Sequence, residues 1–172
     1  MRPGPVSSVG LPAQATGTRC YAGAAGPFIG VPVEHDELIN LVSDLFAVIS
    51  AMSSYPEPYH LPPVQLRPLS ELQAMVCKGP CQLRGFYMPR KGVYLNDTLD
   101  IGNDVIARSV LLHELVHHVQ ELSGRFDIVP NQCDRWWSRE REAYEIQNAY
   151  LRENGNGVRF ALDSLPYMCG DR

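Results

Sequence analysis

The segment Leu111-Leu112-His113-Glu114-Leu115-Val116-His117-His118-Val119-Gln120 determines the expected fold of this chain. Its apolar residues recur at helical spacing, which predicts an amphipathic helix with one buried side. Residues four positions apart in an α-helix project from neighbouring turns on one side, so His113 and His117 lie next to each other. Two neutral imidazoles at this spacing can bind one metal ion, and the adjacent Glu114 can act as a general base.

The apolar residues of this helix favour a metal site over a chance match. They place both histidines at the buried edge of the helix and comprise Leu112, Leu115, Val116, Val119 and Leu122. Burying two imidazoles and a carboxylate without partners is costly, and a bound metal ion removes that cost. The default metal for two histidines and a carboxylate is zinc, although this donor set also admits other divalent ions.

A second helix, at about residues 134–153, would carry the third ligand. Glu140 is followed three residues later by the small Ala143, which would let two helices pack closely at a metal. Glu142 is the rival ligand because it lies next to Ala143 on a face that also has apolar members, and Glu145 is a more distant candidate. Since both faces contain apolar residues, periodicity alone does not choose between Glu140 and Glu142.

The H-E-x-x-H motif and the spacing after Glu140 resemble the gluzincin-type zincin metallopeptidases over about residues 85–152. The resemblance implies that His113, His117 and Glu140 bind zinc and leave a position for water. It also implies that Glu114 takes the proton of that water and passes it to the leaving amine during peptide-bond hydrolysis.

Two features of the catalytic site are left open by the pattern. The family frequently has an aspartate that supports a ligand histidine one place after the small residue, and this chain has Tyr144 there. Peptide hydrolysis also needs a donor to the oxyanion. The candidates are His118, Tyr144, Tyr94 and Tyr87, and for His118 we favour a supporting or surface position.

Two short runs of aromatic and β-branched residues, at 82–88 and 92–96, predict a β-hairpin ahead of the motif helix. In gluzincins an edge strand in this place commonly binds an extended peptide, and the resemblance gives that role to Gly92–Asn96. Asn103 or Asp104 would cap the motif helix, and Gly124 would end it.

The remaining elements complete an α+β fold: a small antiparallel sheet or hairpin flanked by helices, with a metal between two of them. Apolar periodicity predicts a helix at about 34–52, and a proline-rich loop leads to an extended piece around 64–66. Ser70 with Gln73 forms a capping box for a short helix that ends near Cys77. The adjacent pair Trp136-Trp137 is expected to anchor the packing of the two metal-binding helices.

Composition excludes several classes of protein. Of the 172 residues, 45% are hydrophobic and 20% charged, which predicts one globular domain at 33–172. Residues 1–32, rich in Gly, Pro and Ala, read as a flexible arm. The net charge of -4 provides no basic surface for nucleic acid. We find no signal peptide and no apolar run long enough to span a membrane.

The five cysteines bear on the cellular compartment. Cys77 and Cys81 flank a Gly-Pro turn, which favours a local disulfide, alone or with a second bridge between Cys133 and Cys169 that leaves Cys20 unpaired. Five reduced thiols are the alternative. Disulfides would indicate an oxidising compartment, so an exported or periplasmic location is slightly favoured.

Together these residues predict a zinc metallopeptidase that acts on a peptide or protein substrate. A first alternative is a catalytically silent binding or sensor domain that the metal stabilises, although such a site has no need for Glu114 beside a ligand. A second alternative is a zinc-dependent amidase that acts on a non-peptide amide, whose chemistry would use the same residues.

Overall fold

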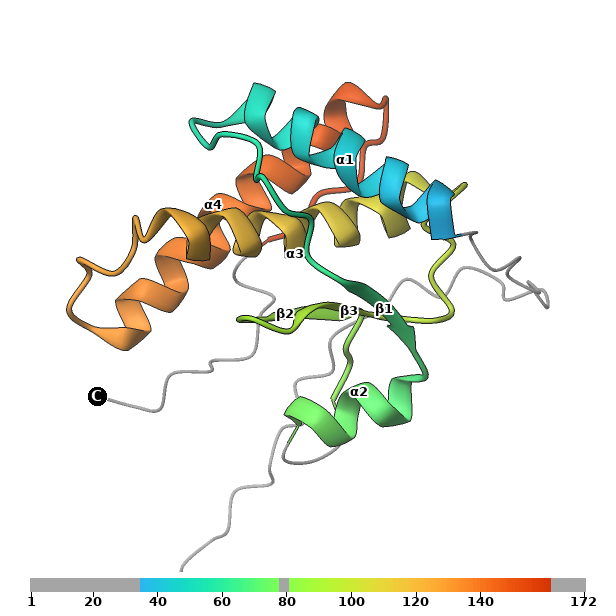
Figure 1. Ribbon diagram of the computed structural model, residues 1–172, viewed down its shortest axis with the longest axis horizontal. Coiled ribbons are helices and arrows are strands. Elements are labelled where there is room, and N and C mark those ends of the chain that lie inside the picture. Colours follow the sequence, from blue (N-terminus) through green and yellow to red (C-terminus); the bar gives the residue numbers. More distant parts are fainter. Residues whose placement is uncertain (1–34, 78–80, 162–172) are drawn as a thin grey trace, which may run out of the picture.

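The computed structural model describes residues 35–77 and 81–161, so the predicted arm lies outside the described residues. Four helices and a three-stranded sheet make these residues an α+β fold (Figure 1). The elements are α1 (His35–Met52), β1 (Val64–Arg67), α2 (Leu69–Val76), β2 (Gly85–Met88), β3 (Gly92–Asn96), α3 (Val105–Ser123) and α4 (Gln132–Glu153). Each lies where the sequence predicts an element of its type.

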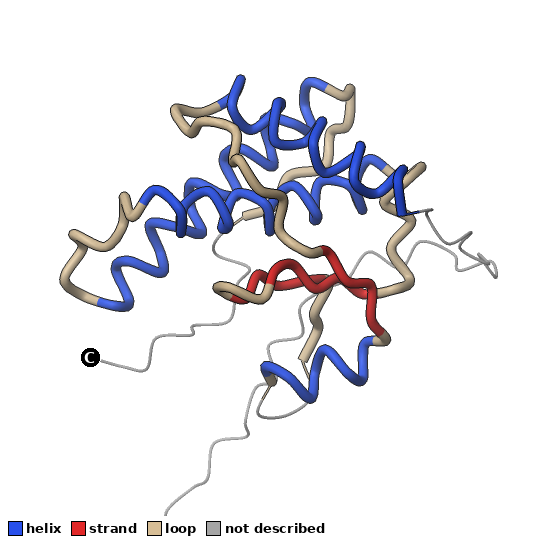
Figure 2. The backbone as a smooth tube through the Cα atoms, viewed as in Figure 1, coloured by secondary structure: helices blue, strands red, loops and turns tan. Residues whose placement is uncertain are grey.

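The sheet corrects one prediction about the strands. The hairpin of β2 and β3 is antiparallel as expected, but β1 pairs in parallel with the other side of β3, giving the order β1-β3-β2 (Figure 2). The sheet is therefore mixed, and Gly92–Asn96 is its central strand. A strand with two bonded neighbours has no free edge for a peptide, so the binding role that the resemblance gave to Gly92–Asn96 is wrong.

The ends of the helices follow local signals with one exception. The Asp104 carboxylate accepts a hydrogen bond from the Ile106 amide at the start of α3, and Gly124 ends α3 with a φ of 61°. The predicted capping box of Ser70 is wrong because α2 already begins at Leu69. Pro68 occupies the cap position without a side-chain hydrogen bond, which leaves Ser70 inside the first turn.

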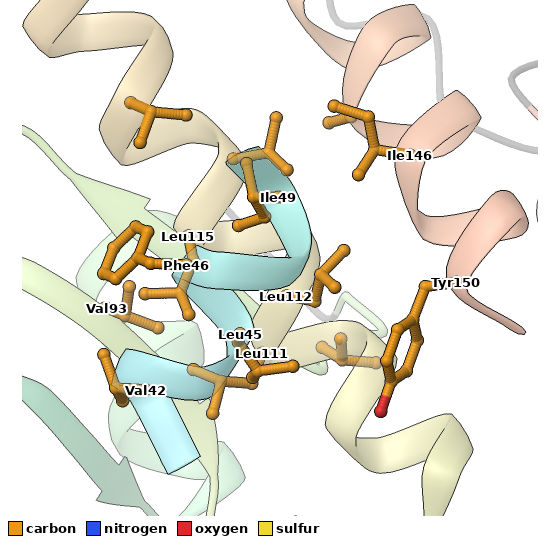
Figure 3. Packing of buried hydrophobic residues seen from close by; sticks show 14 of the residues in the cluster. Val42, Leu45, Phe46, Ile49, Val93, Leu111, Leu112, Leu115, Ile146 and Tyr150 are labelled. Carbon is orange, nitrogen blue, oxygen red and sulfur yellow. The ribbon is translucent and has the colours of Figure 1, made fainter. Parts of the chain in front are cut away.

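The hydrophobic core surrounds α3, which lies between α1 and the sheet and also packs against α4 (Figure 1). Figure 3 shows side chains from four elements meeting in this core: Val42, Leu45, Phe46 and Ile49 of α1, Val93 of β3, Leu111, Leu112 and Leu115 of α3, and Ile146 and Tyr150 of α4. Burial on several sides explains why apolar residues cover more of this helix than a single stripe.

The packing between α3 and α4 includes two buried residues of α4. Ala143 is fully buried and Ile146 lies in the core, whereas Trp136 and Trp137 are half-buried and lie outside the core cluster. The two indoles contact each other, with ring centroids 5.0 Å apart. The anchoring role expected of the two tryptophans between the helices stays a prediction.

Cysteine pairing is settled for one of the predicted bridges. Cys77 and Cys81 form the local disulfide between α2 and β2. Cys133 is also disulfide-bonded. The predicted partner Cys169, and Cys20, lie outside the described residues. Within 35–77 and 81–161, no helix combines the length and the apolar character that a membrane crossing requires.

Candidate metal centre

Three side chains from α3 and α4 converge on one point. The Glu140 carboxylate lies between the two histidines, with Oε2 at 3.4 Å from His113 Nε2 and Oε1 at 3.2 Å from His117 Nε2. All three ligand atoms lie within 4.8 Å of one another. Ligands about 2.1 Å from a tetrahedral zinc ion are about 3.4 Å apart, so both donor set and spacing fit zinc.

Local sequence explains how this group assembles. The spacing of four residues places His113 and His117 on adjacent turns of α3, with ring centroids 4.9 Å apart. Glu140 comes from α4, which approaches α3 closely because the buried residue one turn later is Ala143. Both histidines are more than nine-tenths buried, at 7% and 8% exposure. Such a site excludes most water from the ligands.

Electrostatics favour an ionised carboxylate at the centre. Burial would raise the pKa of Glu140, but hydrogen bonds from His113 and His117 outweigh it and hold the pKa well below the usual range. Burial likewise favours neutral His117, yet the carboxylates of Glu140 and Glu114 raise its pKa above the ordinary value. The ionised carboxylate of Glu140 thus supplies a negative charge that would attract a cation to this cluster.

Glu114 lies beside the cluster and is itself 7% exposed. Burial raises the pKa of its carboxyl group, and the charges of His113 and His117 partly oppose that shift. The backbone N–H of Tyr87 in β2 donates a hydrogen bond to the carboxylate. A buried carboxyl group with a raised pKa beside metal ligands has the properties of a general base.

A glycine allows β2 to pack closely on β3 beside Glu114. A Cβ atom on Gly85 would lie 2.5 Å from Leu95 Cδ2, 3.0 Å from the Tyr94 carbonyl oxygen and 3.5 Å from Glu114 Cγ. Any larger residue at this position would therefore press against β3, whereas its distance to Glu114 would be an ordinary contact.

Glu142, the alternative third ligand, is not part of this cluster. Its carboxylate accepts hydrogen bonds from the Tyr55 hydroxyl at 2.6 Å, from Gln120 Nε2 at 3.0 Å and from Arg125 Nη1 at 2.7 Å. These bonds connect α4 to α3 and to the loop that follows α1. Glu145 is exposed on the outer face of α4.

Tyr144 lies closest to the ligands among the candidate oxyanion donors. Its ring centroid is 4.4 Å from that of His113, and on its other side it stacks on Phe160 at 6.3 Å. Burial raises the pKa of its hydroxyl, and the charges of Glu140 and Glu114 raise it further. The hydroxyl therefore stays protonated and lies within reach of both carboxylate charges.

The other oxyanion candidates have different neighbours. The Tyr87 hydroxyl and His118 Nδ1 are hydrogen-bonded at 3.2 Å, and the His118 ring also contacts Phe46. Burial lowers the pKa of His118. Tyr94 stacks on Phe86 with ring centroids 5.0 Å apart. His118 thus contacts Tyr87 and Phe46, and its supporting role at the site stays a prediction.

Two buried glutamines, which the motif analysis does not single out as site residues, contact the histidines. Gln120 Oε1 lies 2.9 Å from His117 Nδ1, and Gln147 Oε1 lies 3.1 Å from His113 Nδ1. Both glutamines are 2% exposed. A signal for them does exist in the sequence. Gln120 follows His117 by three residues on an apolar helix, and Gln147 shares the helix face of Glu140.

Comparison with known families gives one match. A family model described as "Domain of unknown function (DUF6647)" matches residues 34–165, which is most of the chain and includes every residue of the cluster. Comparisons with curated proteins and with solved structures gave no match. The chain therefore belongs to the family described as a domain of unknown function, DUF6647.

Proposed function

We propose that this protein is a zinc-dependent metallopeptidase of the gluzincin type. The observation that carries the proposal is the convergence of His113, His117 and Glu140 within 4.8 Å of one another, with the buried Glu114 beside them. Two imidazoles and one carboxylate are the ligand set of several hydrolytic zinc sites, and a fourth position is left for water. When bound, zinc supplies the Lewis acidity that activates that water and polarises the scissile carbonyl.

Glu114 has the role of general base and then general acid. Its raised pKa, caused by burial, brings the carboxyl group closer to the pH at which it can both accept and release a proton. β2 packs beside Glu114, since a Cβ atom on Gly85 would lie 3.5 Å from Glu114 Cγ. Glu114 accepts the proton of the attacking water and returns it to the nitrogen of the leaving amine.

Tyr144 is the donor that we assign to the oxyanion. Its ring packs against His113, and the charges of Glu140 and Glu114 keep its hydroxyl protonated. That hydroxyl makes no hydrogen bond with another residue of the described part of the chain, so its proton is available to substrate. A neutral phenol at this position can stabilise negative charge that develops on the carbonyl oxygen.

Among residues 35–77 and 81–161, β2 pairs with a strand on one side alone, and its other edge offers a place for an extended peptide. Asn96 N–H donates to the Arg84 carbonyl at 2.8 Å, and hydrogen-bonded pairs alternate along an antiparallel ladder. Gly85 and Tyr87 therefore direct their main-chain groups away from β3, and the Tyr87 N–H contacts Glu114. A substrate strand added to this edge would run past the catalytic carboxylate.

An oxidising compartment is the location that fits this proposal. The disulfide between Cys77 and Cys81 and the bonded state of Cys133 support it, because disulfides persist mainly in exported proteins.

A Glu114→Gln variant tests the proposed function. The unmodified protein should bind about one zinc ion per chain and cleave members of a fluorogenic peptide library. The variant should keep its zinc and lose roughly 10²–10⁴-fold in turnover, because the amide cannot accept the water proton. Equal cleavage by both proteins would contradict the assignment of Glu114.

Substrate choice separates the peptidase from its alternatives. A silent binding domain would bind zinc but cleave no peptide, with or without Glu114. Cleavage of non-peptide amides alone, again dependent on Glu114, would instead identify an amidase. A Tyr144→Phe variant should lower kcat with little change in KM if its hydroxyl contacts only the developing oxyanion.

A further inference from the structure

We propose that Gln120 and Gln147 are positioning residues that keep a proton on Nδ1 of His117 and His113, so that Nε2 is the nitrogen that binds a metal. Nε2 of each ring faces Glu140 and releases its proton when a metal ion replaces that hydrogen bond. The inference rests on the proposed metal site and names the residues that prepare it. In the gluzincin family an aspartate frequently supports a ligand histidine at the position that Tyr144 occupies in this chain. The two glutamines would provide that support here.

The orientation of Gln147 follows from the residues behind it. The Ser109 hydroxyl donates to the Ile106 carbonyl at 2.7 Å, so the Ser109 oxygen can only accept the next hydrogen bond. Gln147 Nε2 donates to that oxygen at 3.1 Å. The amide oxygen of Gln147 must then face His113 Nδ1, which must carry the proton.

Gln120 is oriented by two groups that can only accept. Its Nε2 lies 3.0 Å from the Arg139 carbonyl oxygen and 3.0 Å from Glu142 Oε2, which uses both amide hydrogens. The amide oxygen therefore faces His117 Nδ1 at 2.9 Å. Arg139 Nε also donates to this oxygen at 3.3 Å and holds it from the other side. A flipped amide would place two donors against Arg139 Nε and His117.

Both chains of hydrogen bonds thus determine that Nδ1 of each ligand histidine donates a hydrogen bond. Each begins at an acceptor that cannot change its role and ends at Nδ1 of a ligand histidine. All atoms along them are buried or half-buried, so water does not compete for the amides. The rings are held in one orientation, with Nδ1–H already bonded and Nε2 facing Glu140, before a metal arrives, which reduces the reorganisation that binding requires.

The neutral charge of the two amides has a further consequence. A carboxylate behind a ligand histidine raises the basicity of the ring, whereas an amide orients the ring with a weaker effect on basicity. Zinc held by amide-supported histidines keeps more of its positive charge. Glutamate could not replace either glutamine, because its second carboxylate oxygen would face groups that only accept hydrogen bonds.

Zinc affinity, measured by competition with a chelator on the full chain, tests the positioning role. Gln147→Leu and Gln120→Leu should each weaken zinc binding by about 10–100-fold, because leucine accepts no hydrogen bond from Nδ1 of the ligand histidine. Gln73→Leu is the matched control, because Gln73 makes a side-chain hydrogen bond to the Cys81 carbonyl far from α3. Its zinc affinity should not change.

Nuclear magnetic resonance of ¹⁵N-histidine-labelled protein provides a readout independent of affinity. In the zinc-loaded protein, two-bond couplings should show a proton on Nδ1 and none on Nε2 for both His113 and His117. The Nδ1–H of His113 should exchange faster with solvent in Ser109→Ala, because the serine no longer orients the amide of Gln147. This milder variant serves if a leucine variant does not fold.

The outcomes separate the inference from the proposed function. Absence of zinc binding in the unmodified protein would overturn both. Zinc binding that resists both leucine substitutions, or ligand histidines protonated on Nε2, would overturn the positioning role and leave the metal site intact. Weaker binding in Gln73→Leu to the same extent would show a general loss of fold instead of a local effect, and would also overturn it.

Discussion

Glu140 and Glu142 lie two residues apart on α4 and face different partners. Glu140 accepts hydrogen bonds from His113 and His117 in the candidate metal site, whereas Glu142 accepts one from the Tyr55 hydroxyl at 2.6 Å and others from Gln120 and Arg125. Two residues span about 200° around a helix, so only the Glu140 carboxylate reaches the two histidines. This divergence makes the two glutamates a matched pair for mutation.

Glu140→Ala should remove zinc from the protein, whereas Glu142→Ala should retain about one ion per chain at saturating zinc. The second variant should instead lose about 1–3 kcal/mol of unfolding free energy, because the buried Tyr55 hydroxyl loses its charged acceptor. Elemental analysis of the purified variants, with urea unfolding for stability, checks both expectations. Loss of zinc from the Glu142 variant alone would assign the third ligand to Glu142.

Zinc should raise the melting temperature of the protein. A ligand at 100 times its Kd stabilises the native state by about 2.7 kcal/mol. In a domain of this size each kcal/mol shifts Tm by about 2–4 °C. Calorimetry with zinc and after chelation measures the shift. The same titration of His113→Ala should give no change, and an equal shift in that variant would place the stabilising ion elsewhere.

Gly85→Ala should destabilise the pairing of β2 with β3. The added methyl group would meet Leu95 Cδ2 at 2.5 Å and the Tyr94 carbonyl at 3.0 Å, and both residues belong to β3. We expect a loss of about 1–3 kcal/mol, as for other overpacked sites, and a lower peptidase activity because a displaced β2 no longer packs in the same way beside Glu114. Gly157→Ala is the control, since a Cβ there meets no atom within 4 Å. Equal unfolding free energies for the two variants would show that the structure around Gly85 accommodates a methyl group without a loss of stability.

Tyr55 should contribute to the loss of stability in alkali. Burial, together with the hydrogen bond and charge of Glu142, raises the pKa of its hydroxyl to about 12. The value in the unfolded chain is about 10, so the native state favours the protonated phenol. The stabilisation is therefore complete below about pH 10 and is lost as the pH rises towards 12.

A Tyr55→Phe variant isolates this effect from other buried tyrosines. It should be less stable than the unmodified protein at neutral pH, because the bond to Glu142 is absent. Its unfolding free energy should then decline less steeply between pH 10 and 12. Urea unfolding at a series of pH values measures the two slopes, and parallel slopes would exclude a contribution from Tyr55.

Local signals in the sequence predict much of this fold. Asp104 and Gly124 mark the ends of α3 because capping depends on a few adjacent residues. The hairpin of β2 and β3 is likewise predicted from neighbouring runs. The position of β1 is not, because its parallel pairing joins Val64 to Val93 across a long stretch of chain that includes α2. Edge and centre of a sheet are properties of such distant contacts.

The candidate site shows the same division. Helical spacing alone brings His113 and His117 together, and the resemblance selected Glu140. The choice between Glu140 and Glu142 depends on the rotation of α4 against α3, which periodicity does not fix when both faces contain apolar residues. Gln120 lies in the sequence segment of the motif helix. Its role depends on two acceptors from α4, the Arg139 carbonyl and the Glu142 carboxylate, which only the packed structure brings next to it.

The placement of the cluster on α3 and α4 also has a consequence for the order of folding. The three residues of the cluster fall between His113 and Glu140, 27 positions apart, and Tyr87 of β2 precedes Glu114 by the same 27 positions. Loops of equal length lose about the same entropy on closing, so neither side of α3 has an advantage of this kind over the other. We therefore expect the candidate ligands and Glu114 to reach their places together, as α4 and the sheet cover α3 from its two sides.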